Sequence, residues 1–191
     1  MLGRYVQLLH AIDLFRPQSI VEIGTWSGEN AIRMILRAQK YHEKVDYIGY
    51  DLFEEATPAT DSAELNIKRH FHVDEVEGRI KAACPDSEIH LIKGNTRKTL
   101  TRVSADFCFI DGGHSVETIS SDHARCSGSS VIVHDDYYVP DADGAMPDIG
   151  LYGCNRLMGD LAHKGGFILP MADPVKGGGM VQMVMLSGGG K

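Results

Sequence analysis

Short apolar runs, rich in β-branched and aromatic side chains, alternate along the chain with segments in which apolar residues recur at helical spacing. Each run ends at polar or glycine-rich residues, which is typical of buried strands. The predicted strands are residues 19–24, 45–51, 88–94, 105–111 and 129–136. The predicted helices between them include 29–40, 96–103 and 115–126. This order favours a doubly wound, mostly parallel sheet covered on both faces, an α/β fold of three layers.

The C-terminal part of the chain has a different pattern. A helical stretch over 154–163 is followed by two apolar runs, 166–171 and 180–186, which a glycine-rich segment joins. These runs predict an antiparallel hairpin on the edge of the sheet. We expect one domain over residues 1–187 and a flexible tail over 188–191.

Two segments depart from the regular alternation. Residues 52–87 form a long, charged and largely helical insertion, and residues 137–153 are rich in Pro, Gly and Asp. A loop as long as the second is usually either a lid or a disordered excursion. We predict a lid, because the loop leaves the sheet at the edge where acidic residues follow the strands.

Composition narrows the class of protein. The 191 residues are 43% hydrophobic and 24% charged, as in ordinary soluble domains, and the net charge of −7 argues against a nucleic acid partner. No apolar run approaches the roughly 18 residues of a membrane span, and the four cysteines are widely spaced, as in reduced cytosolic proteins. We therefore expect a cytoplasmic protein with a small-molecule partner and no membrane. A homo-oligomer is left open.

Polar features follow three consecutive predicted strands. The first is VEIGTWSGEN, in which Glu22 lies in the strand and a turn from Gly24 to Gly28 leads into a helix. Glycine lets a ligand approach the backbone, and a helix N-terminus supplies free N–H donors. The spacing differs from the dinucleotide pattern G-x-G-x-x-G. Taken alone, a turn without any ligand explains this stretch equally well.

The next two strands end in residues suited to a nucleoside. Asp51 ends the second strand and can accept hydrogen bonds from both ribose hydroxyls. Asn95 and Thr96 follow the third strand and can bind an adenine edge. Each of these residues can instead cap the next helix. Because ligands bind beyond the carboxyl ends of parallel strands, their shared position favours one nucleoside site.

Acidic residues end the last two parallel strands. Asp111 ends one, and Asp135 with Asp136 ends the next. Adjacent strands lie about 4.8 Å apart, so we expect these carboxylates to converge. Their mutual repulsion would be relieved by a hard divalent cation such as Mg²⁺. The alternative is a strand-end turn with helix-capping acids.

The sequence FIDGGHS places His114 three residues after Asp111. An imidazole is a plausible general base near neutral pH, although His114 can instead satisfy hydrogen bonds within its loop. We expect Gly112 and Gly113 to leave room for cofactor and substrate between the acid and the base.

These motifs resemble a known family. VEIGTWSGENAIRM, YIGYD and ADFCFIDGGH are similar to motifs of the class I S-adenosylmethionine-dependent methyltransferases, over roughly residues 15–190. More narrowly, they resemble the metal-dependent O-methyltransferases, both the catechol type and the type that methylates sugars of macrolide-like natural products. IDGGHSVE is especially similar to the second type. The resemblance implies a Rossmann-like fold, S-adenosylmethionine as cofactor, S-adenosylhomocysteine as product, and Mg²⁺ or a similar divalent cation.

The resemblance also implies roles for residues. It assigns the base to His114 and the metal to Asp111, Asp135 and Asp136. It assigns the cofactor to Glu22, Gly24, Thr25, Trp26, Ser27, Gly28, Asp51, Leu52, Asn95, Thr96, Asp111 and Gly112.

The predicted reaction is direct transfer of a methyl group to a hydroxyl. A metal favours a substrate with two neighbouring oxygens, so we expect a sugar or another diol-bearing metabolite. Three alternatives stay open: an NAD-dependent oxidoreductase, a protein of this fold that binds the cofactor without transfer, and a metal-independent O- or N-methyltransferase.

Overall fold

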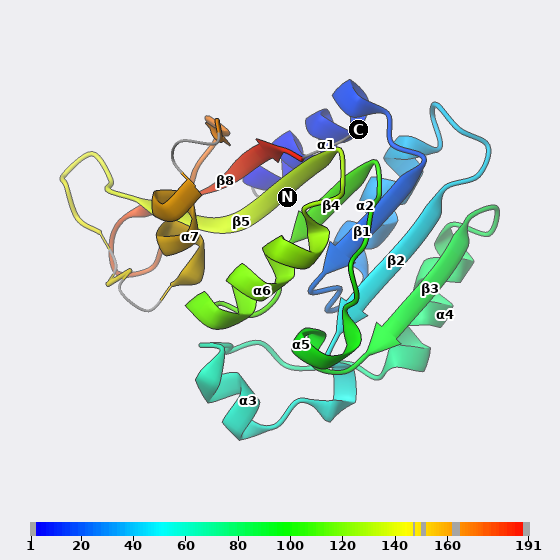
Figure 1. Cartoon of the computed structure of the whole chain (residues 1–191), viewed down its shortest axis with the longest axis horizontal. Coiled ribbons are helices and arrows are strands. Elements are labelled where there is room, and N and C mark those ends of the chain that lie inside the picture. The colour runs from blue at the N-terminus through cyan, green and yellow to red at the C-terminus, as the bar shows by residue number, and fades with distance from the viewer. Residues whose placement is uncertain (1–2, 147, 150–151, 162–164, 189–191) are drawn as a thin grey trace.

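A twisted sheet forms the centre of the molecule (Figure 1). The computed structural model describes residues 3–146, 148–149, 152–161 and 165–188. Within these residues the strand order is β3-β2-β1-β4-β5-β8-β6, and β7 pairs with β8. The parallel strands are β1 (Ser19–Ile23), β2 (Asp46–Asp51), β3 (Glu88–Lys93), β4 (Phe107–Ile110) and β5 (Val131–Val139). The antiparallel strands are β6 (Phe167–Ile168), β7 (Asp173–Pro174) and β8 (Met180–Ser187).

Helices cover both faces of this sheet. One hydrophobic cluster joins one face to α1 (Gly3–Phe15), α2 (Glu29–Ala38) and α4 (Val73–Ala83). A second cluster joins the other face to α6 (Val116–Cys126) and α7 (Gly153–Leu161), close to the single turn α5 (Thr96–Thr99). The helix α3 (Pro58–Ala63) and the 3₁₀ turn η1 (Phe53–Glu55) lie beyond the carboxyl ends of the strands (Figure 1). The predicted Rossmann-like, three-layer α/β fold is confirmed.

The predicted elements are found with shifted ends. All five parallel strands form, and the predicted hairpin is present, although β6 has two residues. The helix expected over 96–103 ends at Thr99, and residues 162–163 of the stretch after Cys154 lie outside the described residues. The insertion over 52–87 contains η1, α3 and α4. The sequence reading did not identify α1, although Leu8, Ala11 and Ile12 have helical spacing and are buried.

The loop expected over 137–153 begins later than predicted. Tyr137, Tyr138 and Val139 extend β5 and pair with Gln182, Val181 and Met180 of β8. The irregular part starts at Pro140, and residues 147, 150 and 151 lie outside the described residues. Its role as a lid stays a prediction.

The predicted C-terminal end of the domain lies at the sheet. The N–H of Gly188, the first residue of the expected tail, donates to the carbonyl of Ser130 at 2.9 Å.

Among the described residues, none of the helices is both long and apolar enough to cross a membrane.

Candidate active site

A cavity of about 460 Å³ opens at the carboxyl ends of the parallel strands, around the point where the strand order reverses between β1 and β4. Most residues of the predicted cofactor site line it: Gly24, Thr25, Trp26, Ser27, Asp51, Leu52, Asn95, Thr96, Asp111 and Gly112, together with His114. Glu22, Gly28, Asp135 and Asp136 are outside this lining. The structure therefore brings together the three strand-end features that sequence analysis connected.

The turn after β1 depends on its glycines. Gly24 has a φ of 92°, and a Cβ there would overlap the carbonyl oxygen of Asp111. Gly28, with a φ of 78°, precedes α2 and packs against Ile80 and Val76. Both positions are in the left-handed region that glycine adopts without penalty. The turn is thus held against β4 and α4, and one of its faces borders the cavity.

Asp51 fixes this turn from β2. One carboxylate oxygen accepts the N–H of Trp26 at 2.8 Å, and the other accepts the N–H of Phe53 at 2.9 Å. Asp51 lines the cavity, and each oxygen can accept a further hydrogen bond, since a carboxylate can accept about four. Asp51 can therefore hold the turn and a ligand at the same time.

Ser27 of the turn and Glu22 of β1 differ in their position relative to the cavity. The Ser27 hydroxyl lines the cavity and is buried, yet it has no hydrogen-bond partner among the described residues. Glu22 lies beneath the lining, where it accepts the hydroxyl of Tyr47. Burial raises the pKa of Glu22 well above its usual value, and the Tyr47 hydrogen bond offsets part of this. A polar ligand would satisfy Ser27, so this part of the site fits the predicted cofactor.

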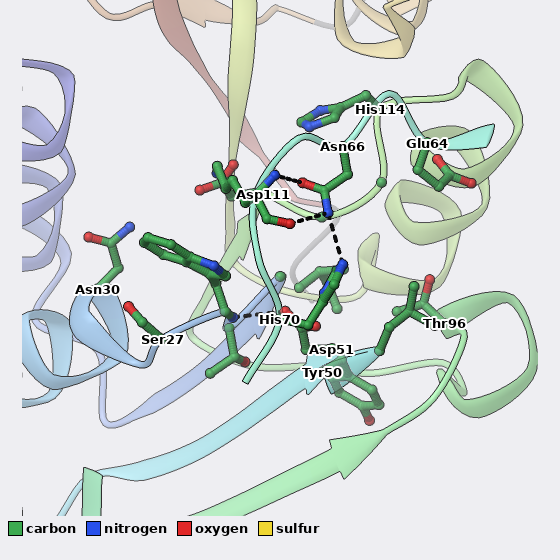
Figure 2. A pocket seen from close by; sticks show the side chains of 18 of the residues that line it. Ser27, Asn30, Tyr50, Asp51, Glu64, Asn66, His70, Thr96, Asp111 and His114 are labelled. Carbon is green, nitrogen blue, oxygen red and sulfur yellow. Dashed lines mark hydrogen bonds between the residues drawn. The ribbon is translucent and has the colours of Figure 1, made fainter. Parts of the chain in front are cut away.

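A segment that we call the roof, residues 57–72, covers the cavity. The side chains of Asn66 and His70 point toward the same space as those of Asp51 and Thr96 (Figure 2). His70 and Asn66 both bind Asp61, at 2.8 Å and 2.9 Å. Sequence analysis identified the insertion but not these residues, because polar side chains without periodicity give no sign of the surface that they face.

Glu64 attaches the roof to the segment that follows His114. It accepts the N–H and hydroxyl of Ser115 at 3.0 and 3.2 Å and the hydroxyl of Thr118 at 2.6 Å. A Cβ on Gly113 would lie 2.5 Å from this carboxylate, and a Cβ on Gly112 would lie 2.9 Å from Ile23. The two glycines thus also permit close packing within the protein, in addition to their position at the cavity.

Each of the three strand-end acids has a partner within the protein, and Asp111 and Asp135 share one of them. The two carboxylate oxygens of Asp135 share the single N–H that Nε of Arg4 donates, at 2.8 and 3.1 Å. The Tyr5 hydroxyl lies 3.3 Å from Asp111 and 3.1 Å from Asp135. Asp136 contacts Nδ1 of His114 at 2.9 Å. Burial raises the pKa of Asp111 to about 6, although nearby Lys68 acts in the opposite direction.

His114 has the surroundings of a general base. Burial lowers its pKa, but the carboxylate of Asp136, followed by that of Asp111, more than offsets this, so the pKa is raised above its ordinary value. Because Nδ1 faces Asp136, Nε2 is the nitrogen that can accept a substrate proton. Tyr152 packs edge-on against the imidazole, with ring centres 6.2 Å apart.

These positions do not fit the predicted metal site. A magnesium ion needs several oxygens that converge, whereas Asp135 is paired with Arg4, and Asp136 with His114. No group of three or more His, Cys, Asp or Glu residues in the described part of the chain is arranged to hold a metal ion. Sequence analysis missed Arg4 and Tyr5, because nothing in the N-terminal pattern connects them to acids more than 100 positions away.

The family of this protein follows from a comparison with known protein families. Residues 21–137 match the model of a methyltransferase domain family. The match covers more than half of the chain, so the protein belongs to this family. No curated protein matches the sequence significantly.

Solved structures agree with this result. An O-methyltransferase of Streptomyces achromogenes, TomG, involved in tomaymycin synthesis and solved with S-adenosylmethionine, is 18% identical, with a TM-score of 0.60 over 97% of this chain and 79% of that chain. An O-methyltransferase of Bacillus cereus, solved with S-adenosylhomocysteine, is 15% identical, with a TM-score of 0.63 over 96% and 80%. The calicheamicin methyltransferase CalS11 is 15% identical, with a TM-score of 0.62 over 96% and 79%.

At these identities the solved structures establish the fold. Together with the family match, they confirm the prediction of a class I S-adenosylmethionine-dependent methyltransferase. They argue against the NAD-dependent oxidoreductase that the position of Asp51 left open.

Proposed function

We propose that this protein transfers the methyl group of S-adenosylmethionine to a hydroxyl of a small molecule. The observation that carries the proposal is the His114–Asp136 pair beside a cavity lined by the predicted cofactor residues. O-methyltransferases among the structural neighbours support the choice of a hydroxyl as acceptor.

Different residues of the cavity would bind different parts of the cofactor. Asp51 and Leu52 would hold the ribose, Asn95 and Thr96 the adenine, and the turn from Gly24 to Ser27 the methionine part, with the unpaired Ser27 hydroxyl as one donor. When bound, S-adenosylmethionine supplies an electrophilic methyl group on a positively charged sulfur. The roof lines one side of this space. With cofactor and substrate bound it would limit the access of water, which favours a reaction in which opposite charges are neutralised.

His114 provides the acid–base chemistry. Asp136 orients the imidazole through Nδ1 and stabilises its protonated form, while Nε2 takes the proton of the acceptor hydroxyl. This arrangement places the base on a loop that Glu64 holds in position.

The divalent cation is left out of the proposed mechanism, because the carboxylates predicted to bind it are paired within the protein. A sugar or other diol-bearing metabolite stays a prediction for the substrate. The cytoplasmic location and the homo-oligomer also stay predictions.

Calorimetry with S-adenosylhomocysteine tests the cofactor site. We expect about one molecule bound per chain and a loss of binding in Asp51→Ala. Asp46→Ala is the matched control, because Asp46 lies at the exposed opposite end of the same strand. Absence of binding to the wild type would rule out the proposal.

Transfer of a labelled methyl group to a panel of hydroxyl compounds tests the reaction. His114→Gln should lower the rate by about 10²- to 10⁴-fold, the usual contribution of a general base. It should keep its affinity for S-adenosylhomocysteine. A protein that binds this compound but methylates nothing in the panel would support the alternative of binding without transfer.

A further inference from the structure

Arg4 brings a positive charge into the acidic cluster formed by Asp111, Asp135 and Asp136 at the ends of β4 and β5. Arg4 of α1 reaches Asp135 through Nε and Asp173 of β7 through Nη1, at 3.3 Å. The backbone N–H groups of Gly3 and Arg4 also donate to Asp173, at 2.7 and 3.0 Å. The guanidinium is thus fixed between two carboxylates from separate strands.

This cation is buried along with its partner. The side chains of Arg4 and Asp135 are 12% and 1% exposed. A guanidinium stays protonated under all ordinary conditions, and its planar set of donors matches carboxylates well. Breaking such a buried pair is unfavourable, because a single charge would be left without a partner.

Strand geometry separates the two adjacent acids. Side chains of successive strand residues point to opposite faces of a sheet. Asp135 points toward α1, where Arg4 and Tyr5 contact it, and Asp136 points toward His114. An irregularity in β5 between His134 and Tyr137, with a φ of 59° at Asp136, adds to this separation. A single ion would therefore have to displace Arg4 and turn Asp136 away from His114.

We propose that the guanidinium of Arg4 is the permanent cation of this cluster, and that the site takes no divalent metal ion. Arg4 neutralises Asp135, Tyr5 lies between Asp135 and Asp111, and His114 pairs with Asp136. The inference rests on the proposed function and deepens it, since methyl transfer then proceeds without a bound divalent cation. The N-terminal helix becomes part of the active site, because Arg4 and Tyr5 also line the cavity.

The test combines metal binding with activity. Chelator-treated wild type, with S-adenosylhomocysteine present, is titrated with Mn²⁺ and followed by electron paramagnetic resonance. We expect no saturable binding, and a methyl transfer rate that EDTA does not change.

Arg4→Gln should lower the transfer rate by at least about tenfold, and Arg4→Lys, which keeps the charge, should restore part of it. Arg156→Gln is the control, because Arg156 is 73% exposed and forms an exposed pair with Asp160.

Three results would overturn the inference: one Mn²⁺ bound per wild-type chain and lost in Asp135→Asn, a transfer rate abolished by EDTA, or an unchanged rate in Arg4→Gln. If Arg4→Gln does not fold, the wild-type titration still decides the question. Failure of the wild type to bind S-adenosylhomocysteine would instead count against the proposed function, and the Mn²⁺ titration without that compound would still test the cation of the cluster.

Discussion

At the scale of single residues, the proposed reaction depends on the protonation of His114. The imidazole must be neutral to accept a proton, and the carboxylate of Asp136 favours its charged form. We expect kcat/KM to rise with pH through a midpoint above the ordinary histidine pKa of about 6.5. Asp136→Asn removes the carboxylate next to Nδ1, so its midpoint should move to lower pH. A pH–rate profile of both proteins measures this, and an identical midpoint in the variant would contradict the pairing.

Gly24 gives a second prediction at this scale. An alanine there would need a left-handed backbone and would overlap the carbonyl of Asp111. Gly24→Ala should therefore lower the free energy of unfolding by at least about 2 kcal/mol and abolish binding of S-adenosylhomocysteine. The control is Gly78→Ala in α4, where an added Cβ meets nothing within 4 Å. That change should stabilise the protein by about 0.5–1 kcal/mol, and urea unfolding compares the two.

At the scale of elements, Glu64 connects the roof to the segment that follows His114. Its carboxylate accepts three hydrogen bonds from Ser115 and Thr118, at the start of α6. Glu64→Ala should weaken binding of S-adenosylhomocysteine by about tenfold, since hydrogen bonds to a charged group contribute about 1.5–3 kcal/mol each and exposure reduces this. It should also speed amide hydrogen exchange over residues 57–72.

Hydrogen exchange with mass spectrometry and calorimetry give both quantities. Glu77→Ala is the matched control, because Glu77 pairs with Lys81 on the surface of α4, away from the cavity. If exchange of the roof is the same in Glu64→Ala and in the control, Glu64 does not hold the roof.

The elements also show what the sequence could predict. Apolar runs of four to six residues identify the parallel strands, because burial on both faces leaves a clear pattern. Asp51, Asn95 and Asp111 follow from this, since residues at strand ends share one edge of the sheet. Asp135 and Asp136 were expected to converge on one ion. In the structure they have separate partners, Arg4 and His114, because alternation along β5 and its irregularity direct them apart.

At the scale of the whole molecule, the N-terminal helix α1 and the strand β7 from the C-terminal part of the chain meet beside the site. Arg4 of α1 contacts Asp135 in β5 and also Asp173 of β7, which lies in the C-terminal part of the chain. Such contacts join residues more than 130 positions apart and leave no local pattern. They explain why the cofactor half of the site could be predicted from the sequence and the α1 side of the cluster could not.

Buried acids also affect the stability of the whole protein. Glu22, Asp111 and Asp122 all have pKa values that burial raises. An acid with a raised pKa binds its proton more tightly in the folded state, so folding becomes less favourable as pH rises from the unfolded pKa through the folded one. For these groups, stability falls as pH increases.

Asp122 isolates this effect best, because it lies on α6 outside the lining of the cavity. Burial raises its pKa to about 6, although the nearby Thr96 hydroxyl acts in the opposite direction, and neither carboxylate oxygen has a hydrogen bond of normal geometry in the described part of the chain. The penalty should be absent below pH 3.8 and complete above about pH 6. Asp122→Asn should therefore stabilise the protein by about 3 kcal/mol at pH 8.

Urea unfolding from pH 4 to pH 8 measures the difference between wild type and Asp122→Asn. The difference should grow with pH and level off above pH 6 or slightly higher. His134 does not produce such a difference, since burial lowers its pKa to about 3 and it is present in both proteins. A gap that is constant with pH would mean that Asp122 is already satisfied, for example by a bound water. A gap that grows as predicted would show that the fold retains a buried carboxylate at the expense of stability, close to Thr96 in the lining of the cavity.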